Sequence, residues 1–353
     1  MIAGIFRYSY AQAKTRALKG KLLSPDDWHC LLRMRNIEDL LRYLRGTDYA
    51  PFLSGLSGAG YDVRSVSLAL HDALFRDYAR LSKAVSKGGA RLLGSLLTRY
   101  EAENGKTLLR GVWQAKSASE IRPLLYRLGG LSRLPMEELL QVRPITAAVD
   151  LLQTTLFHAP LLHALAQFKA QGRLFPLEIA ADLAAFGHLA ARLKTLKGLD
   201  RRGAKVLAGE FVDGVNLCWL VRFRRLYGLS PEETINYALP GGHRLALRDL
   251  GNLARTTDLT AFLGALPHPY SMALSPARHW SQVQPLFQQW LVGELHLVFQ
   301  QNPFQIGLQL SYLLLKEMEV KALEGLVSVV DVGESPERFV DLIGLPVKGN
   351  VRV

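Results

Sequence analysis

Residues 213–242 read DGVNLCWLVRFRRLYGLSPEETINYALPGG, and this stretch decides the fold. From Phe211 to Phe223 apolar residues fall on nearly every side, which is typical of a helix enclosed by other elements. Gly228 breaks that helix. Ser230-Pro231-Glu232-Glu233 then supplies the Ser N-cap, the Pro at the first helical position and the Glu of a capping box. Pro240-Gly241-Gly242 ends the second helix, so the stretch predicts two helices joined by a short turn.

The same helical signature extends along the chain. Runs of alternating β-branched residues are scarce, so no sheet is expected. A glycine-rich loop is expected at 54–60. The stretches with helical spacing of apolar residues are 5–23, 63–113, 151–168, 177–197, 284–299 and 304–330. The chain is therefore predicted to be all-α.

Composition limits the class of protein. Apolar residues make up 49% of the 353 residues, so a sizeable core is expected rather than disorder. The formal net charge of +12 favours an acidic partner, which could be protein, nucleic acid or lipid headgroups, although a solvated basic surface gives the same total. Cys30 and Cys218 cannot build a disulfide framework or a zinc site, which fits a reducing compartment. No apolar run is long enough to span a bilayer, so a soluble or peripheral protein is expected.

An internal repeat is marked by three acids, Glu101, Asp213 and Glu319, spaced roughly 110 residues apart. The first two are followed by an asparagine three positions on, whereas Ala322 takes that position in the weaker third copy. An Asp-Leu pair precedes each acid at a nearly constant distance, and a capped helix follows near Ser119, Ser230 and Ser335. Two markers that keep their separation in three copies indicate a genuine helical repeat.

The repeat predicts three similar helical domains, at 1–142, 143–250 and 251–353. A period this long is nearly a small domain and is longer than a solenoid unit. Three like domains side by side are expected to close in a pseudo-threefold arrangement that forms a funnel. Such a shape is better suited to a socket that holds a shaft-like partner than to a pocket in which a reaction takes place.

No catalytic, cofactor or metal site is predicted. Asn104-Gly105-Lys106-Thr107 is similar to the end of a phosphate-binding loop, but Tyr100 stands where that loop needs glycine. The glycines at 55–60 lack the spacing of a nucleophile elbow. His158 and His163 have no cysteine or carboxylate at ligand spacing.

The repeated acids Glu101, Asp213 and Glu319 have a simpler structural interpretation than a catalytic set. Each is expected to begin a helix, where negative charge is favourable at the N-terminal end of the helix dipole, or to pair with an arginine from another repeat.

Arg222, Arg224 and Arg225 cluster with Phe223 and Tyr227, which favours nucleic-acid binding as an alternative function. No recognised DNA- or RNA-binding signature accompanies them, and basic residues are spread along the whole chain. A basic helical-repeat adaptor or a nucleic-acid-binding protein therefore stays an alternative.

Several motifs carry a family resemblance: Tyr8–Lys14, Asp39–Tyr49, Asp213–Leu217, Gly228–Glu233 with Pro240–Gly242, and Lys316–Val320. Together they resemble the C-type (AC39 family) subunit of the prokaryotic V-type (A-type) ATPase or ATP synthase, the counterpart of the eukaryotic d-type subunit. The resemblance covers essentially the full length. Its most specific parts are LRGTDY at 44–49 and LSPEE at 229–233, whereas Gln12, Lys14 and Ala322 stand where the family has Asn, Arg and Asn.

The resemblance implies a funnel of three helical domains that sits on the membrane rotor ring and receives the foot of the central stalk, made of D- and F-type subunits. It implies one copy per complex, at the cytoplasmic face of the membrane and without a transmembrane segment. The implied role is to pass torque between the nucleotide-hydrolysing head and the ion-carrying ring, without catalysis or a cofactor. The complex would couple ATP to transport of protons or sodium.

Two sets of contact residues follow as expectations. If the open end of the funnel holds the stalk, the basic candidates are Arg222, Arg224 and Arg225. If the closed end meets the ring, the candidates are the turns at Ser230-Pro231 and Ser335-Pro336, where apolar helix ends pack on short loops.

Overall fold

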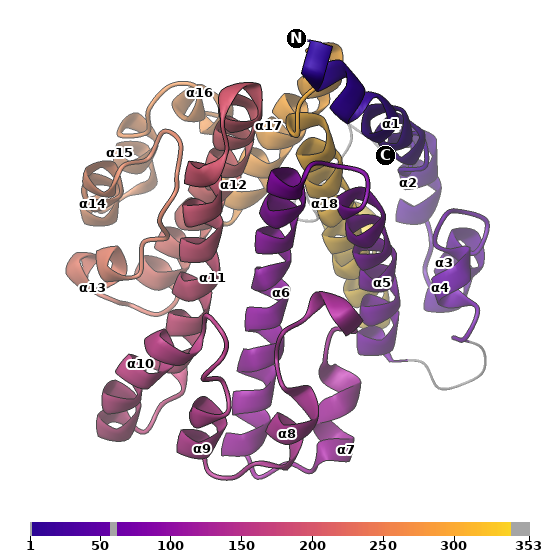
Figure 1. Ribbon diagram of the computed structural model, residues 1–353. Coiled ribbons are helices and arrows are strands. Elements are labelled where there is room, and N and C mark those ends of the chain that lie inside the picture. Colours follow the sequence, from indigo (N-terminus) through magenta and orange to yellow (C-terminus); the bar gives the residue numbers. More distant parts are fainter. Residues whose placement is uncertain (1, 57–61, 340–353) are drawn as a thin grey trace. The chain divides into compact units, whose positions relative to one another are not determined.

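The computed structural model describes residues 2–56 and 62–339, and within these two ranges it contains helices and no strand (Figure 1). The prediction of an all-α protein is confirmed. The expected glycine-rich loop at 54–60 lies largely outside the described residues.

The chain forms two compact units, one from residues 1–86 with 197–353 and one from residues 87–196. We call them unit 1 and unit 2. Their boundaries differ from those of the predicted repeats at 1–142, 143–250 and 251–353. The repeats are defined by sequence similarity, whereas the two units are defined by spatial compactness. The three-repeat division and the funnel therefore stay predictions.

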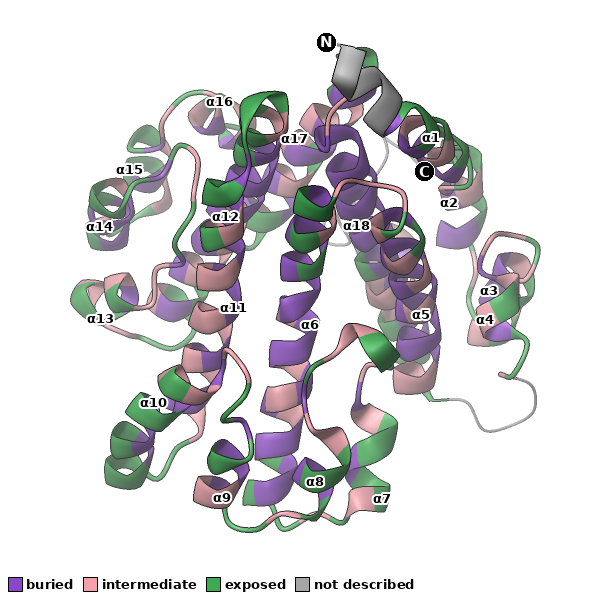
Figure 2. Cartoon of the chain, viewed as in Figure 1, coloured by how far each residue is buried: buried purple, intermediate pink, exposed green. Residues whose placement is uncertain are grey.

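Unit 1 is built around α18 (Gly307–Asp331), which packs against α1, α5, α12 and α17. Figure 2 shows α18 buried along most of its length, as expected for a helix with apolar residues on nearly all sides. The other helices of unit 1 are α1 (Ile2–Lys19), α2 (Pro25–Leu32), α3 (Ile37–Leu44), α4 (Ala50–Leu53), α5 (Val63–Ser82), α12 (Gly198–Arg225), α13 (Pro231–Asn236), α14 (Leu247–Arg255), α15 (Leu259–Gly264), α16 (Tyr270–Leu274), α17 (Val283–Leu297) and the 3₁₀ turns η3 (Trp280–Gln282), η4 (Val298–Gln300) and η5 (Pro336–Phe339).

Unit 2 is organised around α6 (Lys87–Trp113) and α11 (Phe175–Thr195), which pack against each other. Between them Lys106 Nζ lies 2.9 Å from both carboxylate oxygens of Asp182, and both side chains are mostly buried. The remaining elements of unit 2 are α7 (Ala118–Ile121), η1 (Arg122–Leu124), η2 (Gly129–Leu131), α8 (Met136–Gln141), α9 (Ile145–Asp150) and α10 (His158–Gln171).

The predicted turn after Phe223 is confirmed in detail. Helix α12 ends at Arg225, Gly228 adopts a left-handed φ of +64°, and Ser230 caps α13 with Glu233 completing the capping box. The helix expected to start near Ser119 begins instead after the N-cap Ser117, whose capping box uses Glu120.

The helix predicted over 151–168 was wrong at its start. Residues 151–157 form turns, and α10 begins at His158. The hydroxyl of Thr155 donates to the carbonyl of Leu152, a local bond that competes with helix formation.

Candidate functional site

The three repeated acids lie in the interior of long helices and are buried. Glu101 is in the middle of α6, Asp213 of α12 and Glu319 of α18, and their exposed fractions are 7%, 0% and 1%. The prediction that each begins a helix was therefore wrong. We call them the anchor acids because each holds a neighbouring segment through hydrogen bonds.

Asp213 binds the loop that follows Pro240-Gly241-Gly242. Its carboxylate accepts hydrogen bonds from the backbone N–H of His243 at 3.1 Å and of Arg244 at 2.8 Å, and from the Tyr270 hydroxyl at 2.7 Å. Burial raises the pKa of Asp213, while these hydrogen bonds oppose the rise because they favour the ionised carboxylate. One carboxylate thus joins α12 to the loop before α14 and to the start of α16.

Glu319 has the same role on α18, with partners from the other end of the chain. It accepts hydrogen bonds from the backbone N–H of Leu23 at 2.6 Å and from the Tyr49 hydroxyl at 2.8 Å. Lys316 lies 2.8 Å from the carboxylate and 3.8 Å from the centroid of the Tyr49 ring. The expected ionic partner of this acid is thus a lysine on its own helix and not an arginine from another repeat.

Glu101 completes the set in unit 2. It accepts a hydrogen bond from the backbone N–H of Arg133 at 2.5 Å and one from the Ser132 hydroxyl at 3.2 Å. Burial raises the pKa of Glu101, and these two bonds again oppose the rise.

The asparagine of the repeat makes a matching contact in two copies. Asn104 donates to the carbonyl of Tyr126 at 2.9 Å and accepts from its N–H at 2.8 Å, across 22 residues. Asn216 makes the same pair of bonds with Leu239, at 3.0 and 2.8 Å, across 23 residues. Sequence reasoning found the spacing of these residues but missed their function, which is to tie a following segment to the long helix.

Two tyrosines were also missed. Tyr49 and Tyr270 are fully buried and each donates to an anchor acid. Both follow the Asp-Leu pair of their repeat, at Asp39 and Asp258, by a similar number of residues. That shared offset is the signal that could have identified them.

The three candidate arginines at the end of α12 differ in their contacts. Arg224 donates to the carbonyls of Ala254, at 2.8 Å, and Leu229. Arg225 donates to the carbonyl of Thr257 at 2.8 Å, and its guanidinium lies 4.1 Å from the centroid of the Trp280 ring. These two side chains therefore hold the end of α14 and the loop after it.

Arg222, by contrast, is exposed on α12 beside Cys218. Burial raises the pKa of the Cys218 thiol, and the positive charge of Arg222 opposes the rise. Among the three arginines, Arg222 is therefore the one whose guanidinium is most available for contact with a partner.

Exposed apolar residues follow the ends of two long helices. Leu226 and Tyr227, after α12, are 72% and 53% exposed, and Val332, after α18, is 71% exposed. Large apolar side chains exposed together are typical of protein contact sites. Of these three residues, only Tyr227 was singled out from the sequence, as part of the arginine cluster of the nucleic-acid alternative.

Helices α12 and α18 pack against each other and run in the same direction. Near their starts, Leu207 of α12 faces Gly307 of α18. Further along, the positive charge of Lys321 on α18 also opposes the rise that burial causes in the pKa of the Cys218 thiol on α12, so these two residues are near each other. The surface at the end of α12, formed by Arg222, Leu226, Tyr227 and Ser230, is called here the helix-end surface.

Two of the candidate contacts are neighbours in the chain. The arginines were expected at one end of a funnel and the turns at Ser230-Pro231 and Ser335-Pro336 at the other. Helix α13 begins directly after the turn that ends α12, so the arginines and Ser230-Pro231 are close together, whereas Ser335-Pro336 follows α18. The assignment of these contacts to the two ends of a funnel stays a prediction. Ser335 is further joined to α2–α3 by Arg35, which donates to its hydroxyl at 2.6 Å and to Glu337 at 2.8 Å.

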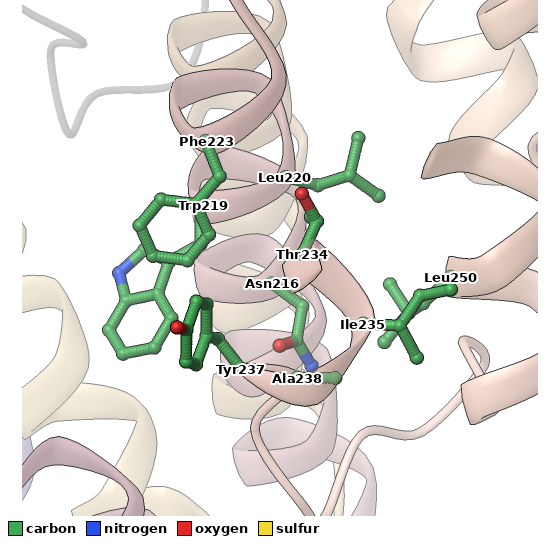
Figure 3. A pocket seen from close by; sticks show the side chains of 9 residues that line it. All are labelled: Asn216, Trp219, Leu220, Phe223, Thr234, Ile235, Tyr237, Ala238 and Leu250. Atoms are coloured by element: carbon green, nitrogen blue, oxygen red, sulfur yellow. The ribbon is translucent and has the colours of Figure 1, made fainter. Parts of the chain in front are cut away.

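A hollow beside this surface does not have the properties of a ligand site. It lies between α12, α13 and α14, and Figure 3 shows Trp219 and Tyr237 on one side of it and Ile235 and Leu250 on the other. Its empty space is about 250 Å³ including the part open to solvent, below the roughly 300 to 1,000 Å³ of typical ligand pockets. The amide of Asn216, its central polar group, is already bonded to Leu239.

Over residues 2–56 and 62–339, none of the helices combines the length and the apolar character needed to cross a membrane. In the same ranges no group of His, Cys, Asp and Glu side chains is arranged to hold a metal ion.

Comparison with known proteins gives consistent matches over nearly the whole chain. The family model described as "ATP synthase (C/AC39) subunit" matches residues 11–338. The C-type subunit of the A-type ATP synthase of Halorubrum lacusprofundi is 26% identical over 348 residues, covering 94% of this chain and 95% of the relative. The corresponding subunit of Methanocaldococcus jannaschii is 22% identical, with 97% and 88% covered, and that of Methanothermobacter thermautotrophicus is 26% identical, with 92% and 84% covered.

Proposed function

Because the chain belongs to the ATP synthase (C/AC39) subunit family, we propose that it is a non-catalytic rotor subunit of a V/A-type rotary ATPase. In this role it is a socket that receives the central stalk, sits on the membrane rotor ring and transmits torque between them. Its partners are the D- and F-type stalk subunits and the ring, with one copy of this chain per complex at the cytoplasmic face of the membrane. The complex couples ATP to proton or sodium transport.

The observation that carries this proposal is the set of anchor acids. A subunit that transmits torque must move as a rigid body, so its short helices have to stay fixed to its long ones under load. Charge-assisted hydrogen bonds that a buried carboxylate accepts from backbone N–H groups are among the strongest available for this purpose. Asp213 and Glu319 make such bonds on two long helices of unit 1, and Glu101 makes them in unit 2.

We assign the helix-end surface to the contact with the membrane ring. Leu226 and Tyr227 supply apolar area, and a protein partner would bury it. Because Arg224 and Arg225 are bonded within the chain, they are poor candidates for a separate stalk contact. Arg222 then contributes charge at the edge of the same surface.

The experiment is affinity purification of the tagged chain from detergent-solubilised membranes of its own cells, with partners identified by mass spectrometry. Wild type is expected to recover stalk and ring subunits together. The double variant Leu226→Ser/Tyr227→Ser is expected to keep the stalk and lose the ring. Met272→Ser is the matched control, because Met272 is also exposed in unit 1, at 66%, but lies on α16.

Each part of the proposal has its own contrary outcome. Unchanged ring recovery by the double variant removes the helix-end surface from the contact. Recovery of neither partner by wild type overturns the rotor role. If the tagged chain instead recovers nucleic acid, and its affinity for that nucleic acid falls steeply as the salt concentration rises, the nucleic-acid alternative is established.

A further inference from the structure

A second buried carboxylate lies next to one of the anchor acids. Glu210 is on α12, three positions before Asp213, so the two side chains are neighbours on one helix face. Glu210 is 2% exposed, and its Oε2 has no hydrogen-bond partner. A buried carboxylate oxygen without a partner is costly when ionised, and this cost falls if the group takes up a proton.

The surroundings of Glu210 are mostly acidic. The charged and titratable groups that face it come from its own helix, from α16, from α17 and from the loop before α14, and they are Asp213, Tyr270, Glu294 and Arg244. Of these only Arg244 is positive, and its Nε lies 3.7 Å from Glu210 Oε1, beyond hydrogen-bond distance. Burial first, and then the charge of Glu294, raise the pKa of Glu210 to about 7.

Arg244 connects the two carboxylates. Its backbone N–H donates to Asp213 at 2.8 Å, while its side chain is the cation nearest to Glu210. The residue before it, His243, packs against α12 so closely that a Cβ on Gly209 would overlap its Cβ. The segment 243–245 therefore lies against α12 beside both the anchor acid and Glu210.

We propose that Glu210 is a proton-binding site that controls how firmly Asp213 holds the segment 243–245. With the proton bound, Glu210 is neutral and Asp213 is the single anion for the backbone N–H groups. Without the proton, a second anion lies beside Asp213 and attracts the Arg244 side chain. The segment bonded to Asp213 is then pulled toward Glu210, and its hydrogen bonds to Asp213 weaken.

The direction of the pH effect follows from linkage. A carboxyl group whose pKa is higher in the folded than in the unfolded protein stabilises the fold most at low pH. This stability falls as pH rises from about 4.5, the ordinary value for glutamate, to about 7, and it is constant above that. Near neutrality Glu210 is therefore about half protonated, and a small change in pH changes its proton occupancy most in this range.

The test is hydrogen exchange of the backbone amides of 243–245 in the full-length chain between pH 5.5 and 8.5, corrected for intrinsic rates. Wild type is expected to lose protection about tenfold as pH rises. This corresponds to about 1.4 kcal/mol of hydrogen bonding to Asp213 that is lost when Glu210 ionises. Glu210→Gln, which is neutral at every pH, is expected to abolish that pH dependence. Glu232→Gln, an exposed glutamate on α13, is the matched control and should behave as wild type.

A second variant separates titration from loss of structure. Arg244→Gln keeps the backbone N–H that Asp213 binds but removes the cation that ionised Glu210 attracts, so the fall in protection of 243–245 with rising pH should become much smaller. A purely structural role of Arg244 would lower protection equally at every pH and leave that fall unchanged. Equal pH dependence in wild type and Glu210→Gln would overturn the proposal. So would an Arg244→Gln variant that loses protection with rising pH as much as wild type does.

Discussion

The carboxylate of Asp213 occupies the space in which a side chain at residue 242 would begin. A Cβ built on Gly242 would meet Asp213 Oδ1 at a separation that real side chains essentially never show, and it would also approach the carbonyl of Leu245 at 3.1 Å. Gly242 is therefore required because the loop passes so close to α12. Helix α13 already ends at Asn236, so the prediction that Pro240-Gly241-Gly242 ends it was wrong. The glycine at 242 instead makes room for the anchor acid.

Gly242→Ala should reduce the free energy of unfolding by about 1–3 kcal/mol, because the new methyl group forces the loop away from the Asp213 carboxylate. Chemical denaturation monitored by circular dichroism measures the loss. Gly293→Ala is the matched control in the same unit, since nothing lies within 4 Å of a Cβ at that helical position. A neutral Gly242→Ala variant would contradict the close approach.

Asn216→Ala and Asn104→Ala should destabilise the protein to a similar extent, because each leaves one backbone N–H and one carbonyl without a partner, buried at Leu239 and partly buried at Tyr126. An orphaned group costs about 1–3 kcal/mol, so we expect a loss of about 3 kcal/mol in each variant. The exposed Asn236 on α13 gives the control, Asn236→Ala, with a change within about 0.5 kcal/mol. Clearly unequal losses would mean that the two contacts are not equivalent parts of a repeat.

Lys106→Met should destabilise unit 2 by about 3–5 kcal/mol, since it leaves the Asp182 carboxylate buried without a cation. Burial already raises the pKa of Asp182 to about 6 against the opposing charge of Lys106. Without that lysine the folded pKa rises further, so the loss should be smaller at pH 5, where Asp182 is protonated, than at pH 8. Thermal unfolding at both pH values checks this, with the exposed Lys169→Met on α10 as control. A loss independent of pH would exclude an ionised Asp182 as its cause.

Arg224→Ala and Arg222→Ala should differ, although the two residues are near neighbours on α12. The first leaves the carbonyls of Leu229 and Ala254 without their donor and should cost about 1–3 kcal/mol. The second removes an exposed side chain and should change stability by less than about 0.5 kcal/mol. Equal losses in denaturation experiments would contradict the distinction between a structural and an exposed arginine.

Much of the fold could be predicted because its signals are local. The turn from α12 to α13 depends on Gly228, Ser230 and Glu233, which act within a few residues of each other. The all-α class follows in the same way from periodicity. The starts of α7 and α10 were misjudged, because the choice between neighbouring serines and the bond of Thr155 to Leu152 have no distinct sequence signal.

The function of the anchor acids could be predicted only in part. Their spacing is visible in the sequence, but their partners are set by long-range packing: Glu319 binds Leu23 across 296 residues. Likewise, Leu226 and Val332 are residue types usually found in a core, and their exposure becomes visible only in the folded structure. The two roles of the clustered arginines also depend on where α14 ends, which local sequence does not specify.

The bond between Glu319 and the first helices has a consequence for biosynthesis. Leu23 and Tyr49 leave the ribosome 296 and 270 residues before the carboxylate that holds them. At about 5–20 residues per second, this delay is on the order of tens of seconds. Unit 2 is continuous in sequence and is complete much earlier. The faces of α1 and α3 that pack on α18 have to wait for that helix, so unit 1 can be completed only after its last long helix has emerged.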